Sequence, residues 1–536
     1  MARFDMKENT RGLAIGLGLV VAFKLWLVHT EEIYGSATEF DALWYLNAAK
    51  HWYWGSEYSF TAFARPPAYP LFVAFLHLCR LPLRTGIELM QIGGYLALTA
   101  GLRRAGVSRV ICVASFAAMV LHPGSFEQNN YTMADSFYAA LLPFALGGVL
   151  LTLFTGKVRH AAWTGITLAV LWDTREESFL IPVMLAAFFA VALVRQRFAL
   201  GSWKTAARFW LKPAGALLGL LTMLLVAVDA ANYRVFHSFS KSELTSSNFQ
   251  GAYKALLRIR PSRNQRFISV STEALEMAYK VSPTFAQLKT QFEGELGHNW
   301  QVPALTALGL HEIGAPWFLW ALRSVTATTH DLHKTPASAN RFYRTAAREI
   351  NRALDDGRIP SRLVLSGFLD PGALASICYM PESLPRIAGL FLLRYSKTAG
   401  RDDTILTDSQ SGLYDEMTSR GAANSSREGI SITLENLIGR YHRFLVVGLS
   451  VAGVVAAMML GWRFRRLQIS DPINGVLILL AAAILLRVLL FTYLNATWWI
   501  GGYERYLFPV APIYSCFLIV LIYQSLVIYR GTEDKT

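Results

Sequence analysis

Seven long apolar runs dominate this 536-residue sequence and limit what it can fold into. Each run approaches or reaches the roughly 20 residues that an α-helix needs to cross about 30 Å of hydrocarbon. Because lipid offers the backbone no hydrogen-bond partner, each spanning run must be helical. The sequence therefore predicts an all-α polytopic membrane protein. The runs are 12–27, 136–154, 179–194, 214–228, 444–460, 476–491 and 507–528.

Composition excludes other classes of protein. Hydrophobic residues make up 53% of the chain and charged residues 16%, which is outside the usual range of soluble globular proteins. The net charge of +14 does not indicate nucleic-acid binding, because the Lys and Arg residues fall in short clusters between apolar runs. Of the four cysteines, only Cys378 lies in the large polar region, so no intrachain disulfide framework or cysteine metal site is available.

The basic clusters also predict the topology. Placing them in the cytoplasm allows only an odd number of crossings between the first run and Arg103–Arg104. We therefore expect 87–102 to cross the membrane and 67–78 to lie on the outer face as an interfacial helix. About ten transmembrane helices result, with both termini in the cytoplasm of a bacterial inner membrane. The run 12–27 lacks a cleavage site and is expected to be retained as the first span.

Three regions follow from this topology. Residues 1–231 form an N-terminal transmembrane module, whose first outer loop is 31–86. Residues 232–443 form a mainly helical periplasmic domain between spans 7 and 8, and 444–536 form the C-terminal transmembrane helices. Within the domain, Thr335 and Pro336 are expected to begin a helix. The stretch 398–428, rich in Ser, Asp, Gly and Arg, predicts an exposed loop.

Four segments at predicted outer ends of spans contain residues suited to chemistry. In the first, Asp41 lies just past the first span, with Tyr45 four residues later on a short helix along the membrane. The same outer loop continues with Arg65-Pro66-Pro67-Ala68-Tyr69-Pro70. The other segments are Asn129-Asn130-Tyr131-Thr132-Met133-Ala134-Asp135, Thr174-Arg175-Glu176-Glu177 and Glu504-Arg505-Tyr506-Leu507-Phe508-Pro509.

In this order, the segments resemble the GT-C glycosyltransferases of the protein O-mannosyltransferase and lipid A aminoarabinose transferase type. The resemblance covers residues 10–235 and 444–528 and implies a GT-C-like fold in which 31–86 is the catalytic loop. Two departures stand out. A single Asp41 occupies the place where many relatives have paired acids, and the large soluble region interrupts the spans instead of following them.

The resemblance implies a glycosyltransferase that moves a sugar from a polyprenyl-phosphate carrier to an envelope acceptor on the periplasmic face, with inversion. The acceptor would be a glycan, a lipid or a protein, and membrane lipids would be further partners. The reaction requires no cofactor and is either metal-independent or weakly assisted by a divalent metal. The implied residues are Asp41 and Asp135 in catalysis, Arg175, Arg505, Arg487 and Lys24 at the carrier phosphate, and Tyr45, Arg65, Glu127 and Tyr506 at the substrate.

The chemistry of sugar transfer explains why these residue types are expected at the site. Cleavage of the glycosidic bond leaves a phosphate whose negative charge must be met by cations, and arginine stays charged near lipid and can bind two phosphate oxygens. The acceptor hydroxyl needs a base on the opposite face of the sugar, which is the role given to Asp41. Arg487 and Lys24 fall inside apolar runs, where an ionisable group usually faces a partner or a cavity.

Each assignment has a structural alternative. Asp41 and Asp135 could cap their helices, and Arg175 could pair locally with Glu176 and Glu177. Arg505 could pair with Glu504 or extend toward the interface, as Lys24 could. His330-Asp331-Leu332-His333 is interpreted as a loop or helix start, because its spacing is weak support for a metal site.

Two other functions remain open at this point. A transporter or flippase of a lipid-linked saccharide would explain the ionisable groups in the spans. However, the halves of the chain show no paired repeats and no broken spans of the kind many transporters use. A non-catalytic glycan-binding membrane protein would keep the fold without the chemistry.

Overall fold

The computed structural model describes most of the chain, and its regular structure is helical. One isolated β-bridge joins Ile259 to Ser361, and no strand occurs within the described residues. The predicted all-α class is therefore confirmed. The described residues are 10–29, 31–33, 39–369, 371–392, 408–419, 429–462 and 471–533.

A helix lies at each of the ten predicted spans. Seven described helices are long and apolar enough to cross a membrane. They are α1 (Thr10–Val28), α7 (Ala134–Thr155), α9 (Leu180–Leu200), α10 (Trp203–Phe236), α21 (Gly429–Trp462), α22 (Pro472–Thr497) and α24 (Ala511–Glu533). Helix α4 (Leu83–Arg104) covers the predicted span 87–102, and α5 (Arg109–Val120) and α8 (Val158–Trp172) lie in the two further intervals where the ten-span topology requires a crossing. Ten crossings thus remain a prediction, and the predicted interfacial helix corresponds to the short apolar α3 (Ala68–Leu78).

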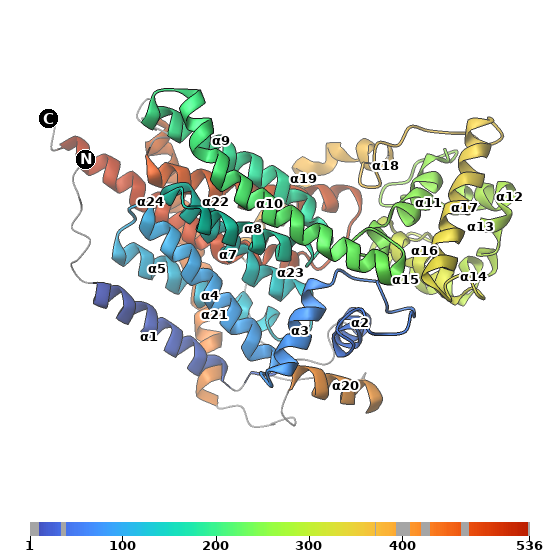
Figure 1. The fold of residues 1–536 in the computed structure, drawn as a ribbon, viewed down its shortest axis with the longest axis horizontal. Helices are drawn as coiled ribbons and strands as arrows, with labels where there is room; N and C mark the ends of the chain where they lie inside the picture. Colours follow the sequence, from blue (N-terminus) through green and yellow to red (C-terminus); the bar gives the residue numbers. More distant parts are fainter. Residues whose placement is uncertain are drawn as a thin grey trace.

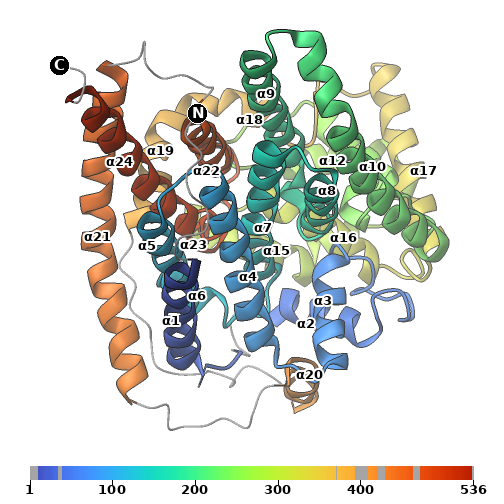
Figure 2. The same ribbon diagram turned by 60° about the vertical axis from the view of Figure 1, so that its left-hand side comes forward.

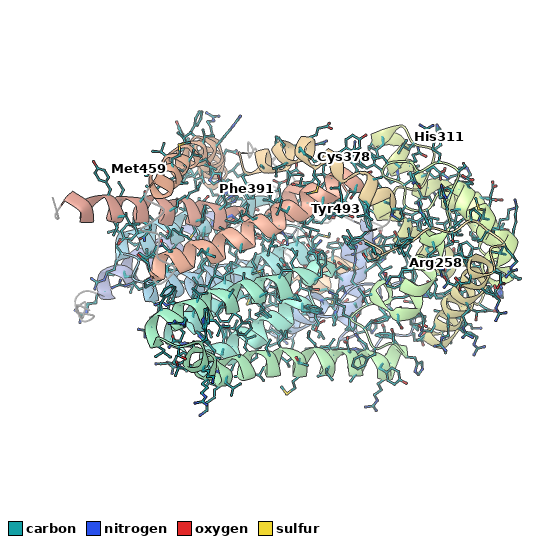
Figure 3. All side chains as sticks on the ribbon, turned by 90° about the horizontal axis from the view of Figure 1, so that it is seen from above. Arg258, His311, Cys378, Phe391, Met459 and Tyr493 are labelled. Atoms are coloured by element: carbon teal, nitrogen blue, oxygen red, sulfur yellow. The ribbon has the colours of Figure 1, made fainter. Side chains whose placement is uncertain are left out.

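The spans and the inserted domain occupy opposite ends of the molecule (Figure 1). In the view from above, Met459 lies among the spans, Arg258 and His311 lie in the inserted domain, and Tyr493 lies between them (Figure 3). The long helix α10 runs along the bundle and reaches the domain. The domain helices are α11 (Ser247–Arg258), α12 (Thr272–Val281), α13 (Pro283–Ala286), α14 (Lys289–Glu293), α15 (Glu295–Leu308), α16 (Ala315–Thr328) and α17 (Pro336–Asp355).

Small residues let two of the bundle helices approach closely. Helices α4 and α7 pack along most of their length. A side chain at Gly147 on α7 would place its Cβ 2.4 Å from the carbonyl carbon of Ala97 on α4. Gly94 on α4 is similarly close to the backbone of Ala140. Small residues at such contacts are typical of helices that associate in a membrane.

The inserted domain has its own apolar core, as expected. The Thr335 side chain accepts a hydrogen bond from the Ser338 amide, and Pro336 occupies the first turn of α17, which confirms the predicted helix start. Phe342, Ala346 and Ile350 recur at helical spacing and are buried. The core formed with α11, α12 and α16 extends from Leu244 to Ile359 and is separate from the core of the span bundle.

The rest of the inserted region does not belong to that core. α18 (Pro371–Ala375), η3 (Ile377–Tyr379), α19 (Met380–Gly389) and η4 (Leu390–Leu392) follow the domain, and α19 packs along α22 in the bundle. The limits 232 and 443 also fall within helices, because α10 extends to Phe236 and α21 begins at Gly429.

The predicted loop 398–428 is wrong where the structure describes it. Residues 408–418 form α20 (Asp408–Thr418), which lies beside α3 and α2 (Glu39–Lys50) (Figure 2). Tyr414 and Met417 are buried against these helices, and Lys50 pairs with Glu416 at 2.8 Å. A few apolar side chains on one face are enough to dock a polar helix on a neighbour. Residues 398–407 and 420–428 lie outside the described residues.

Candidate functional site

Arg65 connects the first outer loop to the other outer segments. It pairs with Asp41 on α2 at 2.7 Å and with Glu176 of η1 (Glu176–Phe179) at 3.3 Å. Its guanidinium lies 4.1 Å from the ring centre of Trp320 on α16. Asp41, whose side chain is 23% exposed, keeps an accessible face despite this pairing. The pair therefore fixes the carboxylate without burying it.

A second ion-pair group joins three spans at the same face. Arg175 pairs with Asp135, in the first turn of α7, at 2.5 Å, and with Glu177 at 2.8 Å. Arg487, buried in α22, pairs with the same Glu177 at 3.2 Å. The local pairing that was an alternative for Arg175 is thus present, and it also reaches Asp135.

Arg487 also fixes the segment that carries Arg505. Its Nε donates to the carbonyl oxygen of Tyr506 on α23 (Tyr503–Leu507) at 2.5 Å. The Tyr506 ring stacks on Phe491 of α22, with ring centres 5.1 Å apart. Arg487 is thereby placed to hold α23 against the outer end of α22.

Arg505 differs from the other arginines of this site. It donates to the Tyr506 hydroxyl at 2.6 Å and lies 4.7 Å from the centre of that ring. Within the described residues, no carboxylate lies within ion-pair distance of it, Glu504 included, and its buried Nε has no hydrogen-bond partner. A partly buried cation with an unused donor can bind an anion without first breaking an ion pair.

Two cavities meet at Arg505. The larger, of about 820 Å³, is lined by Asp41, Arg65, Arg175 and Tyr506, and by aromatic side chains of α15, α16 and α22. The smaller, of about 460 Å³, is lined by Glu127 of α6 (Gly124–Gln128), Asp135 and residues of α21 and α23. Arg505 lines both. A cation therefore lies where the contents of the two cavities would meet.

Glu127 belongs to the smaller cavity. Burial raises the pKa of its carboxyl, a hydrogen bond from the Tyr131 hydroxyl at 3.5 Å opposes this, and the charge of Glu504 raises the pKa further. Three acids, Glu127, Asp135 and Glu504, thus line this cavity, together with the neighbouring rings of His122 and His442. Within the described residues, no group of three or more His, Cys, Asp or Glu side chains could hold a metal ion.

Three predicted site residues line neither cavity: Arg487, which is buried in the ion-pair group described above, Lys24 and Tyr45. Lys24 is fully buried, donates to Ser125 at 2.6 Å and pairs with Glu88 at 3.5 Å, so it is committed to a cluster between α1, α4 and α6. Its position gives no support to a role at the carrier phosphate. Tyr45 is buried edge-on against Tyr69, with ring centres 5.0 Å apart, and lines neither cavity.

A buried clasp fastens the inserted domain to the first outer loop. The fully buried Arg323 of α16 donates to Glu243 of η2 (Glu243–Thr245) at 2.7 Å and to the carbonyl oxygens of Phe60 and Ala62 at 2.6 and 3.0 Å. Burial opposes ionisation of Glu243, but Arg323 and then His333 hold its pKa at about 2. The clasp sets the distance between α16 and the loop that carries Asp41 and Arg65.

The clasp also includes one of the two histidines of the His330–His333 motif. His333 is buried, lies 2.9 Å from Glu243 and stacks on Tyr58 of the outer loop. His330 is exposed and pairs with Asp331 at 2.9 Å. The interpretation of the motif as a loop or helix start did not include this contact, because Glu243 is 90 residues away in the sequence.

Tryptophans of the domain are the other feature that sequence reasoning missed. Trp317 and Trp320 lie on α16 and Trp300 lies on α15, and all three line the larger cavity. The spacing of three residues between Trp317 and Trp320 places both rings on one face of a helix. This spacing in the sequence predicts that the two tryptophans form one aromatic surface.

The buried carboxyl of Asp173, at the C-terminal end of α8, should make the free energy of unfolding depend on pH. Burial raises the pKa of its carboxyl from 3.8 to about 7, although Lys241 lowers it and Asp229 raises it again. The folded chain therefore favours the protonated form, so the free energy of unfolding falls as pH rises from about 4 to 7. At pH 8, Asp173→Asn should be more stable than the wild type by up to roughly 4 kcal/mol, at about 1.4 kcal/mol per pKa unit.

Melting temperatures of the two proteins at pH 4.5 and pH 8 would check this prediction. The advantage of the variant should be large at pH 8 and small at pH 4.5. Asp331→Asn, at an exposed position of the inserted domain, is the matched control and should show no such difference. An equal effect of Asp173→Asn at both pH values would contradict the buried, protonated carboxyl.

Comparison with known proteins gives distant structural likenesses. No protein-family model matches the sequence, and no curated protein matches it. Similar solved structures include ArnT from Cupriavidus metallidurans bound to undecaprenyl phosphate, with 13% identity, 96% of this chain and 77% of that chain covered, and a TM-score of 0.32. The same protein in the apo state gives 12% identity, the same coverage and a TM-score of 0.28.

The oligosaccharyltransferase of Archaeoglobus fulgidus in the apo form is also similar, with 14% identity and a TM-score of 0.38. The alignment covers 98% of this chain and 52% of that one, so this chain spans about half the length of the archaeal protein.

Proposed function

We propose that this protein is an inverting, polyprenyl-phosphate-dependent glycosyltransferase of a bacterial inner membrane that acts on the periplasmic face. The sequence resemblance supports the proposal. One observation carries it: Asp41 and Arg505, far apart in the sequence, line the same cavity between the span ends and the inserted domain. A base and a cation without a carboxylate partner in the described part of the chain, both lining one cavity, are the two groups that the transfer needs.

Asp41 acts as the general base in this mechanism. Its carboxylate accepts the proton of the acceptor hydroxyl as the hydroxyl oxygen bonds to the anomeric carbon. Arg65 holds the carboxylate from one side at 2.7 Å, and its exposed remainder faces the cavity. Arg65 is thus a positioning residue, which keeps the accepting oxygen directed at the acceptor.

Arg505 binds the phosphate that leaves. As the acceptor oxygen attacks, the bond between the anomeric carbon and the phosphate oxygen breaks, and its electron pair stays with polyprenyl phosphate. The guanidinium of Arg505, which lines the cavity without a carboxylate partner among the described residues, can meet this charge. Arg175, which lines the same cavity, adds positive charge, although its pairs with Asp135 and Glu177 reduce it.

The transfer reaction itself is the first test. Purified wild-type protein in lipid nanodiscs would be given radiolabelled polyprenyl-phosphate sugars and a cell-envelope extract. We expect label to move to the extract while an equal amount of polyprenyl phosphate is released. An intact carrier across several sugars would overturn the proposal.

Arg505→Gln should lower kcat/KM by about 100-fold, the usual cost of losing one group that stabilises developing negative charge. Arg505→Lys should retain part of the activity, because it keeps the charge but loses the two-point contact. Rates of carrier-phosphate release would measure both. Arg208→Gln, at an exposed arginine of α10, is the control. Unchanged kcat/KM in folded Arg505→Gln protein would remove Arg505 from the mechanism.

A further inference from the structure

The larger cavity has two unlike walls. The wall from α22 and α23 contains the apolar and aromatic side chains of Leu490, Phe491, Leu494 and Tyr506, together with the charged side chain of Arg505. The opposite wall comes from the inserted domain. It contains Leu296, Asn299, Trp300 and Pro303 of α15 and Pro316, Trp317, Leu319, Trp320, Ser324 and Thr328 of α16.

The indole rings of the domain wall differ in how far they are covered. Trp320 has Arg65 at 4.1 Å from its ring centre and Trp44 at 5.3 Å. Trp317 has one ring neighbour, Trp499, at 5.9 Å. Trp300 has no aromatic or cationic partner within the described residues. Trp300 and Trp317 are half-buried, so each keeps ring surface for a ligand in the cavity.

The domain wall is also uncharged. Among the described residues, α15 and α16 contribute no Asp, Glu, Lys or Arg to the lining of this cavity. They contribute indoles together with the amide of Asn299 and the hydroxyls of Ser324 and Thr328. A flat ring beside hydrogen-bonding groups suits a molecule with an apolar face and a hydroxylated edge. A polyprenyl chain has no such edge, and the side chains of Leu490, Phe491 and Leu494 on α22 suit it better.

We propose that the domain wall is the acceptor subsite and that the acceptor is an uncharged saccharide stacked on Trp300 and Trp317. This rests on the proposed glycosyltransferase function. Asp41 and Arg65 line the same cavity beside this wall, and Arg65 contacts Trp320 directly. A hydroxyl of the bound saccharide can then reach the base. A cavity of about 820 Å³ lies within the range of about 300–1,000 Å³ for small-molecule sites.

Saccharide binding to the full-length protein tests the subsite. The probes are maltotriose, mannotriose and N-acetylchitotriose, titrated against protein in nanodiscs and followed by saturation-transfer NMR. We expect at least one trisaccharide to bind saturably. Trp317→Ala and Trp300→Ala should each weaken its binding at least about tenfold, whereas Trp317→Phe, which keeps an aromatic face, should stay within about threefold.

Trp203→Ala replaces an exposed tryptophan at the first residue of α10, away from the cavity. This variant controls for general effects of losing an indole and should not change binding. Absence of saturable binding by all three trisaccharides would overturn the inference. Binding that is unchanged by both alanine variants would overturn it too.

Release of polyprenyl phosphate from labelled donor, measured in the same preparations, separates this inference from the proposed function. Donor cleavage that depends on Arg505, without saccharide binding, would reject the saccharide subsite and leave the transferase intact. Indole-dependent binding with no donor cleavage would instead reject transfer and leave a glycan-binding membrane protein.

Discussion

Asp41→Asn is expected to lower the rate of sugar transfer by about 1,000-fold while the protein stays folded. Loss of a general base typically costs 100- to 10,000-fold. The asparagine side chain has nearly the same shape and can still accept a hydrogen bond from Arg65, which lies 2.7 Å from the carboxylate. Because the carbonyl oxygen of an amide is a very weak base, the proton of the acceptor hydroxyl would have no acceptor in the transition state.

Initial rates of label transfer at saturating donor would measure this effect, with melting temperature as the check on folding. Asp355→Asn, at an exposed acid of the inserted domain, should leave the rate unchanged. A helix cap at Asp41, the structural alternative, predicts the reverse pattern, with a lower melting temperature and a rate near that of the wild type.

Much of the fold could be predicted from local signals. The apolar runs require helices wherever they cross lipid, and Thr335 with Pro336 marks the start of α17 through interactions within four residues. Asp41, Arg175 and Arg505 could be placed on one membrane face because the basic clusters set the topology. All three line the larger cavity in the structure.

The pairings between these segments could not be predicted. Glu177 and Arg487 are 310 residues apart, and nothing in either segment specifies the other. Lys24 had the same sequence signal as Arg487, an ionisable group in an apolar run. Only packing separates the two, because α1 directs Lys24 to Glu88, whereas α22 directs Arg487 to Glu177 beside the cavity. Burial of a charge thus predicted a partner in both cases, and neither side chain lines either cavity.

Arg323→Met should cause a large loss of stability in the inserted domain. Removing Arg323 leaves the Glu243 carboxylate buried without its main partner and leaves the carbonyl oxygens of Phe60 and Ala62 without their donor. Breaking a buried ion pair in this way typically costs about 3–5 kcal/mol. For a domain of this size, that corresponds to a fall in melting temperature of about 10 °C.

Lys289→Met is the matched control, because Lys289 and Glu293 form an exposed pair at 3.8 Å whose loss should cost well under about 1 kcal/mol. The clasp variant should also slow transfer beyond its effect on stability. Without Arg323, α16 is no longer fixed to the loop that carries Arg65 and Asp41. The acceptor wall and the base are then no longer held in a fixed position relative to each other. Normal transfer by Arg323→Met protein below its melting temperature would show that the clasp stabilises the domain without positioning the site.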